Sequence, residues 1–189
     1  MSIVGLDSLL KLVKEKNLVE NLGKRELNNP EGNGFDLRLG AVHKIVEGGA
    51  YIEADGGVGL GRRKGVKTET IAEFKPDSSE QEIITIKPGE YFLVSTYETV
   101  NMPEDLSAYA YPRSSLQRSG LLLLVTDVDP GYKGTLAFGL TNLGPFEVKL
   151  QLGARFCNIV FTKIEGQTAN YRGQHQGGRV SPDKEERQV

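Results

Sequence analysis

"LLLLVTDVDPGYKGTLAFGLTNL" (residues 121–143) joins two apolar segments through a short polar connection that contains two glycines. In the second segment, Leu136, Phe138 and Leu140 alternate with small residues, which is the two-residue period of a strand with one face in a core. The first segment, residues 121–125, is apolar at every position, which predicts burial on both faces. Its second face would be covered either within a two-layer core or by another subunit.

The same strand signals recur on both sides of this stretch. Residues 35–46 (FDLRLGAVHKIV) place Phe35, Leu37 and Leu39 on one face, and residues 154–164 form a further apolar run. Many short strands separated by turn signals are typical of a sandwich, a barrel or a jelly-roll relative. We therefore expect a mainly β fold.

Two local patterns are more specific. Residues 6–22 have apolar residues at close to helical spacing, which predicts a short N-terminal helix capped by Asp7, with Leu10 and Val13 facing inward. Residues 82–100 predict two strands joined as a hairpin, because the central KPGE segment supplies a proline and a glycine for the bend.

Composition excludes several classes of protein. The chain has 189 residues, 38% of them hydrophobic and 25% charged, which predicts one domain over residues 1–189. Its net charge of -2 predicts no nucleic-acid or membrane partner, and no apolar run reaches the roughly 20 residues of a membrane helix. A charged N-terminal segment and a single cysteine, Cys157, predict a cytoplasmic protein without an intrachain disulfide. We expect Cys157 to pack as a small hydrophobe.

Two segments show no clear period. Residues 53–80 are rich in glycine and charge, and we expect a loop insertion between strands there. Residues 170–189 are polar and predict a flexible C-terminal tail. Both belong to the predicted single domain.

Residues 109–120 (YAYPRSSLQRSG) concentrate the groups that bind phosphate. Arg113, Ser114, Ser115 and Arg118 combine guanidinium and hydroxyl donors in one short loop, as a nucleoside triphosphate requires. A turn with solvated charges would have the same composition. The following connection decides between these two interpretations.

That connection carries two carboxylates and an aromatic ring about a dozen residues later. Asp127 and Asp129 can hold a water, or a water bound to Mg²⁺, for attack, and Tyr132 can press its ring against a sugar. The phosphate interpretation is therefore favoured. One cysteine and two distant histidines, His43 and His175, argue against a zinc catalyst with three such ligands.

Several of these segments together resemble one superfamily. The motifs, in chain order, are GFDLRLG (34–40), PRSSLQRSG (112–120), VDPGYKG (128–134), TNLGPFEVKLQLGARFCNIVF (141–161) and YRGQHQG (171–177). They resemble the dUTPase and dCTP deaminase superfamily over most of residues 33–178. The first motif is similar to the deaminase branch, and the chain as a whole is most similar to the deaminase-like, archaeal-type dUTPases.

The resemblance implies a distorted β-barrel related to the jelly roll and a homotrimer with active sites between subunits. It implies Mg²⁺ as cofactor, held mainly through the triphosphate, with no metal ligands assigned in the protein. Asp129 and Arg118 would be catalytic, Asp129 orienting the attacking water and touching the sugar 3′-hydroxyl. The implied substrate-binding residues are Arg113, Ser114 and Ser115 at the phosphates, Tyr132 under the deoxyribose, and Tyr171 and Gln176 in a closing tail. The tail departs from the deaminase pattern at Gln174 and His175.

Gly139 separates two activities. In the zinc-free deaminases that the chain resembles, a Glu at this position moves protons as water replaces the amino group at cytosine C4, which glycine cannot do. The sequence therefore favours hydrolysis of dUTP to dUMP and pyrophosphate. The alternatives are dCTP deamination, alone or with hydrolysis, in which Asp127 or another subunit supplies the missing group, and a non-catalytic nucleotide-binding regulator. The small residues Thr135, Ala137 and Thr141 beside Gly139 predict close approach of a packed strand or of a ligand.

Overall fold

The computed structural model describes residues 2–55 and 61–188. The helices are α1 (Leu6–Lys16), α2 (Lys24–Asn28) and α3 (Ser114–Arg118). The strands are β1 (Ser2–Ile3), β2 (Val19–Glu20), β3 (Gly34–Glu47), β4 (Tyr51–Ile52), β5 (Arg62–Lys64), β6 (Lys67–Glu73), β7 (Ile83–Ile86), β8 (Tyr91–Asn101), β9 (Leu106–Pro112), β10 (Leu121–Leu124), β11 (Asp127–Val128), β12 (Lys133–Asn142), β13 (Val148–Gln151), β14 (Arg155–Lys163) and β15 (Glu186–Arg187). None of the helices in these ranges has the length and apolar character needed to cross a bilayer.

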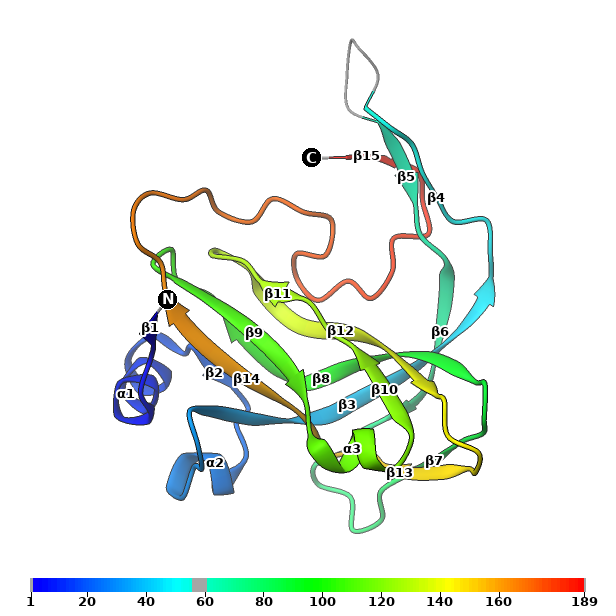
Figure 1. Cartoon of the computed structure of the whole chain (residues 1–189), viewed down its shortest axis with the longest axis horizontal. Coiled ribbons are helices and arrows are strands. Elements are labelled where there is room, and N and C mark those ends of the chain that lie inside the picture. Colours follow the sequence, from blue (N-terminus) through cyan, green and yellow to red (C-terminus); the bar gives the residue numbers. More distant parts are fainter. Residues whose placement is uncertain (1, 56–60, 189) are drawn as a thin grey trace.

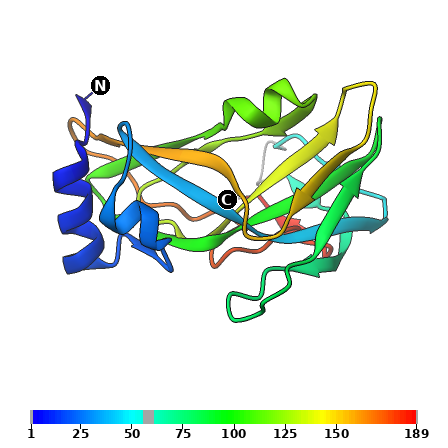
Figure 2. The same cartoon turned by 90° about the horizontal axis from the view of Figure 1, so that it is seen from below.

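One curled sheet organises the chain (Figure 1). Its strands lie in the order β10-β12-β8-β3-β14-β9-β11, with β1, β2 and β6 paired along this path. The register between β3 and β8 shifts between Leu39 and Ala41, and that between β3 and β6 shifts between Val42 and His43. Such irregularities bend strands and increase their twist, so that the sheet wraps around its own apolar face (Figure 2). The mainly β, barrel-like fold with a short N-terminal helix is confirmed.

The residues predicted to form the core lie in it. Phe35, Leu37 and Leu39 on β3 are fully buried, and Leu136, Phe138 and Leu140 on β12 are at most 5% exposed. Cys157 on β14 is also fully buried, which confirms that it packs as a small hydrophobe. Burial raises the pKa of its thiol well above the usual value, and the Glu98 carboxylate adds to this shift.

Helix α1 packs as predicted but begins differently. Leu10 and Val13 contact the core, and Leu9, which precedes Leu10, is fully buried. The helix starts directly after Gly5, which leaves Asp7 inside the first turn, and no side chain caps the start. The predicted Asp7 cap is therefore wrong, since a capping side chain must precede the first helical residue.

The KPGE segment forms a turn without forming a hairpin. Glu90 N–H donates to the Lys87 carbonyl at 3.1 Å, and Gly89 has φ +80°, as the third residue of a type II turn requires. Turns of this type do not match the twist of paired strands and separate the strands that they join. β7 accordingly pairs with β13, whereas β8 pairs with β12 and β3. The predicted hairpin is wrong.

Strand β10 is buried on one face within the chain. Leu121 and Leu123 point into the core, whereas Leu122 and Leu124 are 40% and 49% exposed. The two-layer core considered for this segment is therefore wrong. Coverage by another subunit stays a prediction.

Part of the expected insertion is ordered strand. β6 pairs with β3, and β5 joins β4 and β15 in a small three-stranded sheet. In that sheet Glu186 lies opposite Arg63, and Arg187 lies opposite Arg62. The end of the tail is thus paired with the insertion, while residues 56–60 lie outside the described residues.

Candidate active site

A cavity of about 260 Å³ lies where the connection after β11, the strand β12 and the tail meet. Its lining includes three predicted site residues, Asp129, Tyr132 and Tyr171, together with His175 and Arg179 of the tail. A second cavity of about 400 Å³ shares Asp129, Tyr171 and His175 with the first and extends to β5. Asp129 therefore stands where the two cavities meet.

The turn from Asp129 to Tyr132 is fixed by its backbone. Tyr132 N–H donates to the Asp129 carbonyl at 3.2 Å, and Met102 exchanges hydrogen bonds with Tyr132 and Gly131 at 2.8 and 3.1 Å. Gly131 has φ +75°, and a Cβ there would lie 2.8 Å from the Asn170 side chain. The position requires glycine for both its conformation and its space.

Tyr132 forms a buried wall of the first cavity. Its ring meets that of Tyr171 edge to face, with centroids 5.3 Å apart, and its hydroxyl donates to the Thr135 carbonyl at 2.5 Å. Burial, with a smaller contribution from Tyr171, raises the pKa of Tyr132 to about 12. The phenol therefore stays neutral and offers a flat apolar surface to a ligand.

Asp129 is one of two carboxylates that line this cavity, the other being Asp127. Its pKa is raised, chiefly because the surrounding chain reduces its contact with water and further because of the nearby Asp127 carboxylate. A raised pKa makes the ionised group a stronger proton acceptor than an ordinary Asp. Two carboxylates of like charge also make the site attractive to a cation.

Gln176 holds the tail against the turn. Its amide nitrogen donates to the Gly131 carbonyl at 3.1 Å, and its oxygen accepts from Lys133 N–H at 3.0 Å. Tyr171 N–H adds a bond to the Pro130 carbonyl at 2.7 Å. Gln176 thus contacts backbone in the free chain, and its predicted contact with the nucleotide stays a prediction.

The predicted phosphate cradle lies elsewhere in the chain. Ser114, Ser115 and Arg118 belong to α3, where they are exposed, and none of them lines either cavity of the described chain. Val128 of β11 pairs with Ala108 of β9, and β9 then runs on toward α3 (Figure 1). From residue 108 to residue 113 an extended chain rises about 16 Å. A single chain therefore separates the cradle from Asp129.

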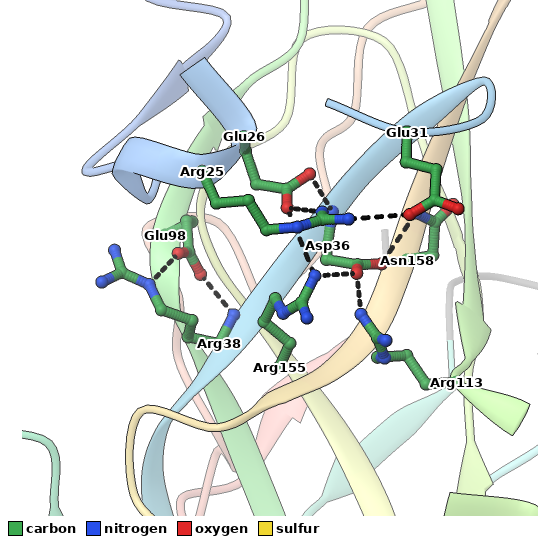
Figure 3. A network of polar contacts seen from close by, with 9 residues as sticks. All are labelled: Arg25, Glu26, Glu31, Asp36, Arg38, Glu98, Arg113, Arg155 and Asn158. Atoms are coloured by element: carbon green, nitrogen blue, oxygen red, sulfur yellow. Dashed lines mark hydrogen bonds and ion pairs between the residues drawn. The ribbon is translucent and has the colours of Figure 1, made fainter. Parts of the chain in front are cut away.

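Arg113 is held by a carboxylate of β3 (Figure 3). Its guanidinium pairs with Asp36, which also accepts hydrogen bonds at 3.0 Å from Arg155 and from Asn158. Burial lowers the pKa of Arg113, as do the nearby cations Arg155 and Arg25. The carboxylates Glu26 and Glu31 act in the opposite direction on this pKa.

Helix α2 and the loop that follows it supply the other carboxylates around Arg113, which are Glu26 and Glu31. Glu26 is buried, pairs with Arg25 at 2.5 Å and accepts from Asp36 N–H at 3.1 Å. Arg25 also reaches the exposed Glu31 at 2.8 Å. The network fixes the β3 backbone and with it the Asp36 side chain that holds Arg113 (Figure 3).

Tyr91 occupies the space above Gly139. A Cβ built at Gly139 would overlap the Tyr91 hydroxyl oxygen and lie 3.0 Å from its Cζ and 3.1 Å from Leu124 Cδ1. The small face of β12 therefore receives a side chain of β8 at Gly139, while Ala137 lines the first cavity. Close approach of a packed strand is confirmed at Gly139, and approach of a ligand at Ala137 stays a prediction.

Sequence reasoning had assigned no role to Asp36, Arg155, Tyr91 or Arg63. Asp36 shares the outer face of β3 with Arg38, so its charge alone did not distinguish it. The other three reach their places through pairing of distant strands. Their sequence neighbours carry no corresponding signal.

Comparison with known proteins gives a consistent result. A sequence model of the dCTP deaminase-like family matches residues 3–164. A dCTP deaminase of Pyrobaculum calidifontis is 34% identical over 190 residues, covering 96% of each chain. A protein of Methanosphaera stadtmanae named "dCTP deaminase, dUMP-forming" is 36% identical over 129 residues, covering 62% of this chain and 61% of its own.

The fold agrees with these matches. The solved structure of 2′-deoxycytidine 5′-triphosphate deaminase from Agrobacterium tumefaciens has a TM-score of 0.62 at 17% identity, covering 87% of this chain and 48% of that one. Fold and site together define a member of the dUTPase and dCTP deaminase superfamily. Within it, the chain belongs to the dCTP deaminase-like family.

Proposed function

We propose that this protein hydrolyses dUTP to dUMP and pyrophosphate. One observation carries the proposal: position 139, where a deaminase of the kind this chain resembles needs an acid–base group, is a glycine beneath Tyr91. Losing a general acid or base typically costs about 10²- to 10⁴-fold in rate. Attack at phosphorus makes no use of that position.

Asp129 would activate water in the proposed reaction. The carboxylate accepts a proton as the water oxygen bonds to the α-phosphorus, and the bond from that phosphorus to the bridging oxygen breaks to release pyrophosphate. Tyr132 would support the deoxyribose with its buried ring. Its place in the first cavity beside Asp129 supports this role.

Mg²⁺ is the proposed cofactor. Asp127 and Asp129 offer oxygen donors of the kind that Mg²⁺ prefers, and a cation would relieve the repulsion that helps to raise the pKa of Asp129. The ion would be held mainly by the triphosphate, with these carboxylates as its protein neighbours. When bound, it neutralises charge on the phosphate oxygens.

A homotrimer would complete the site. We propose that Arg113, Ser114, Ser115 and Arg118 of one subunit face the Asp129 cavity of another, since one chain keeps them apart. The exposed apolar face of β10 supports a subunit contact. Light scattering at micromolar concentration tests this, and a monomer near 20.7 kDa would contradict it.

Product analysis tests the proposed reaction. With Mg²⁺, dUTP should yield pyrophosphate, dCTP should yield little ammonia, and chelation of the metal should stop turnover. UTP should be a poor substrate because Tyr132 would crowd a 2′-hydroxyl. Ammonia release from dCTP at a rate comparable to pyrophosphate release from dUTP would overturn the assignment.

A second candidate is deamination of dCTP, alone or coupled to hydrolysis. The names of the relatives favour it, one of them including "dUMP-forming". Asp127 or a residue of a neighbouring subunit would then supply the proton transfer that Gly139 cannot. The same product analysis decides between the two candidates.

A further inference from the structure

The small sheet of β4, β5 and β15 carries two adjacent arginines in different surroundings. The guanidinium of Arg62 has two carboxylate partners, Glu53 at 2.8 Å and Glu185 at 3.1 Å. Neighbouring residues of a strand point to opposite faces. Arg63 accordingly lies on the other face, toward the second cavity, which it lines.

Arg63 lacks the partner that its position would provide. Glu186 lies directly opposite it on β15, but this carboxylate pairs with Arg179 at 2.7 Å. The Nε atom of Arg63 is buried and has no hydrogen-bond partner within the described part of the chain. A buried donor without a partner is unfavourable and needs an explanation, such as an absent ligand.

The two cavities lie on either side of shared residues that include Asp129. Tyr132 lines only the first cavity and Arg63 only the second, whereas Asp129, Tyr171 and His175 line both. A nucleotide with its sugar against Tyr132 and its α-phosphate beside Asp129 would extend its outer phosphates toward Arg63. Guanidinium is the side chain best suited to such oxygens, because it presents several N–H donors in a fixed plane.

We propose that Arg63 of the insertion is a further binding residue, which contacts the outer phosphates of a nucleoside triphosphate. The proposal rests on the proposed function for the kind of ligand, and it requires no particular reaction. It gives the insertion a role in recognition. The pairing of β5 with β15 would hold Arg63 at the site only when the tail is in place.

The matched variants are R63Q and R62Q, which remove one charge each from neighbouring positions. Calorimetric titration of the full chain with α,β-imido dUTP, α,β-imido dCTP and deoxyuridine measures binding without cleavage at the α-phosphorus. We expect R63Q to weaken both triphosphate analogues by about 10- to 100-fold, in line with charge-assisted hydrogen bonds, and deoxyuridine by less than about twofold. R62Q should leave all three affinities near those of the wild type, because exposed ion pairs contribute little. R63K should recover part of the loss.

Three results would overturn the proposal. In the first, R63Q binds both triphosphate analogues as tightly as the wild type does. In the second, R62Q and R63Q lose affinity equally, and the loss extends to deoxyuridine. In the third, the wild-type protein binds neither triphosphate analogue. If the wild type binds the dCTP analogue through Arg63 but does not hydrolyse dUTP, the proposed function fails and the role of Arg63 stands.

Discussion

The contact between Tyr91 and Gly139 predicts that G139A lowers the free energy of unfolding in the wild type and raises it in a Y91A background. In the wild type, G139A places a Cβ against the Tyr91 hydroxyl and 3.0 Å from its Cζ. Overpacking of this kind typically costs about 1–3 kcal/mol. Replacing a strand glycine by alanine otherwise stabilises by about 0.5–1 kcal/mol, and no positive φ at this position opposes it.

The net effect follows from these two terms. In the wild type, G139A should lower the free energy of unfolding by up to about 2 kcal/mol. In a Y91A background the obstructing ring is gone, and the same substitution should raise that free energy by about 0.5–1 kcal/mol. The coupling energy of the double-mutant cycle should therefore be about 1–3 kcal/mol.

Urea denaturation of the four proteins measures this coupling at one fixed protein concentration, since assembly changes apparent stability. Y91F is the matched control, because it removes only the oxygen nearest the new Cβ and should relieve part of the strain. If G139A has the same effect in both backgrounds within about 0.5 kcal/mol, Tyr91 does not occupy the space above Gly139.

Three further predictions concern the site and its supports. D129N should abolish most turnover, while the affinity for α,β-imido dUTP should stay within a small factor of the wild type. Because the pKa of Asp129 is raised in the folded protein, the protonated form contributes stability that is lost as pH rises through that pKa. At pH 7 the carboxylate contributes no such stability, so D129N should not lower Tm there. Turnover of the wild type should fall as pH drops through the same pKa, and a D129N protein that is fully active or clearly less stable would contradict the assignment. Q176A removes both side-chain bonds to the turn, so the tail should be cleaved faster by trypsin at an unchanged Tm; unchanged cleavage would argue against the anchor. E98A leaves two donors of Arg38 without the carboxylate that accepts their hydrogen bonds at 2.7 Å. Because the Arg38 side chain is partly exposed, the substitution should cost about 1–3 kcal/mol in urea unfolding, and an effect below about 0.5 kcal/mol would be evidence against the pair.

The strands predicted correctly carry their signal within their own residues. β3 and β12 each bury one face against a continuous core, and an apolar residue at every second position is enough to show this. The partner of a strand is not encoded in the strand's own residues: β7 pairs with β13, which lies far along the chain. The KPGE segment showed where the chain turns and gave no information about which strand each arm would join.

The site residues also differ in whether neighbouring sequence predicts them. Asp129 and Tyr132 lie on one short turn, so their proximity followed from spacing, and the family resemblance suggested Tyr171 beside them. Arg63 reaches the second cavity, and Tyr91 reaches the space above Gly139, through strands that are distant in sequence. Alternation shows that a gap exists above a small residue, but not which side chain fills it.

The buried thiol of Cys157 gives the molecule an internal reporter. It lies on β14 between β3 and β9, opposite Leu37 on one side and Pro112 on the other. A thiol reagent reacts with the thiolate, which burial suppresses here, so modification requires these strands to separate. Because the chain has one cysteine and no tryptophan, the labelling rate under native conditions would report opening of the barrel at a single known position, without any engineered probe.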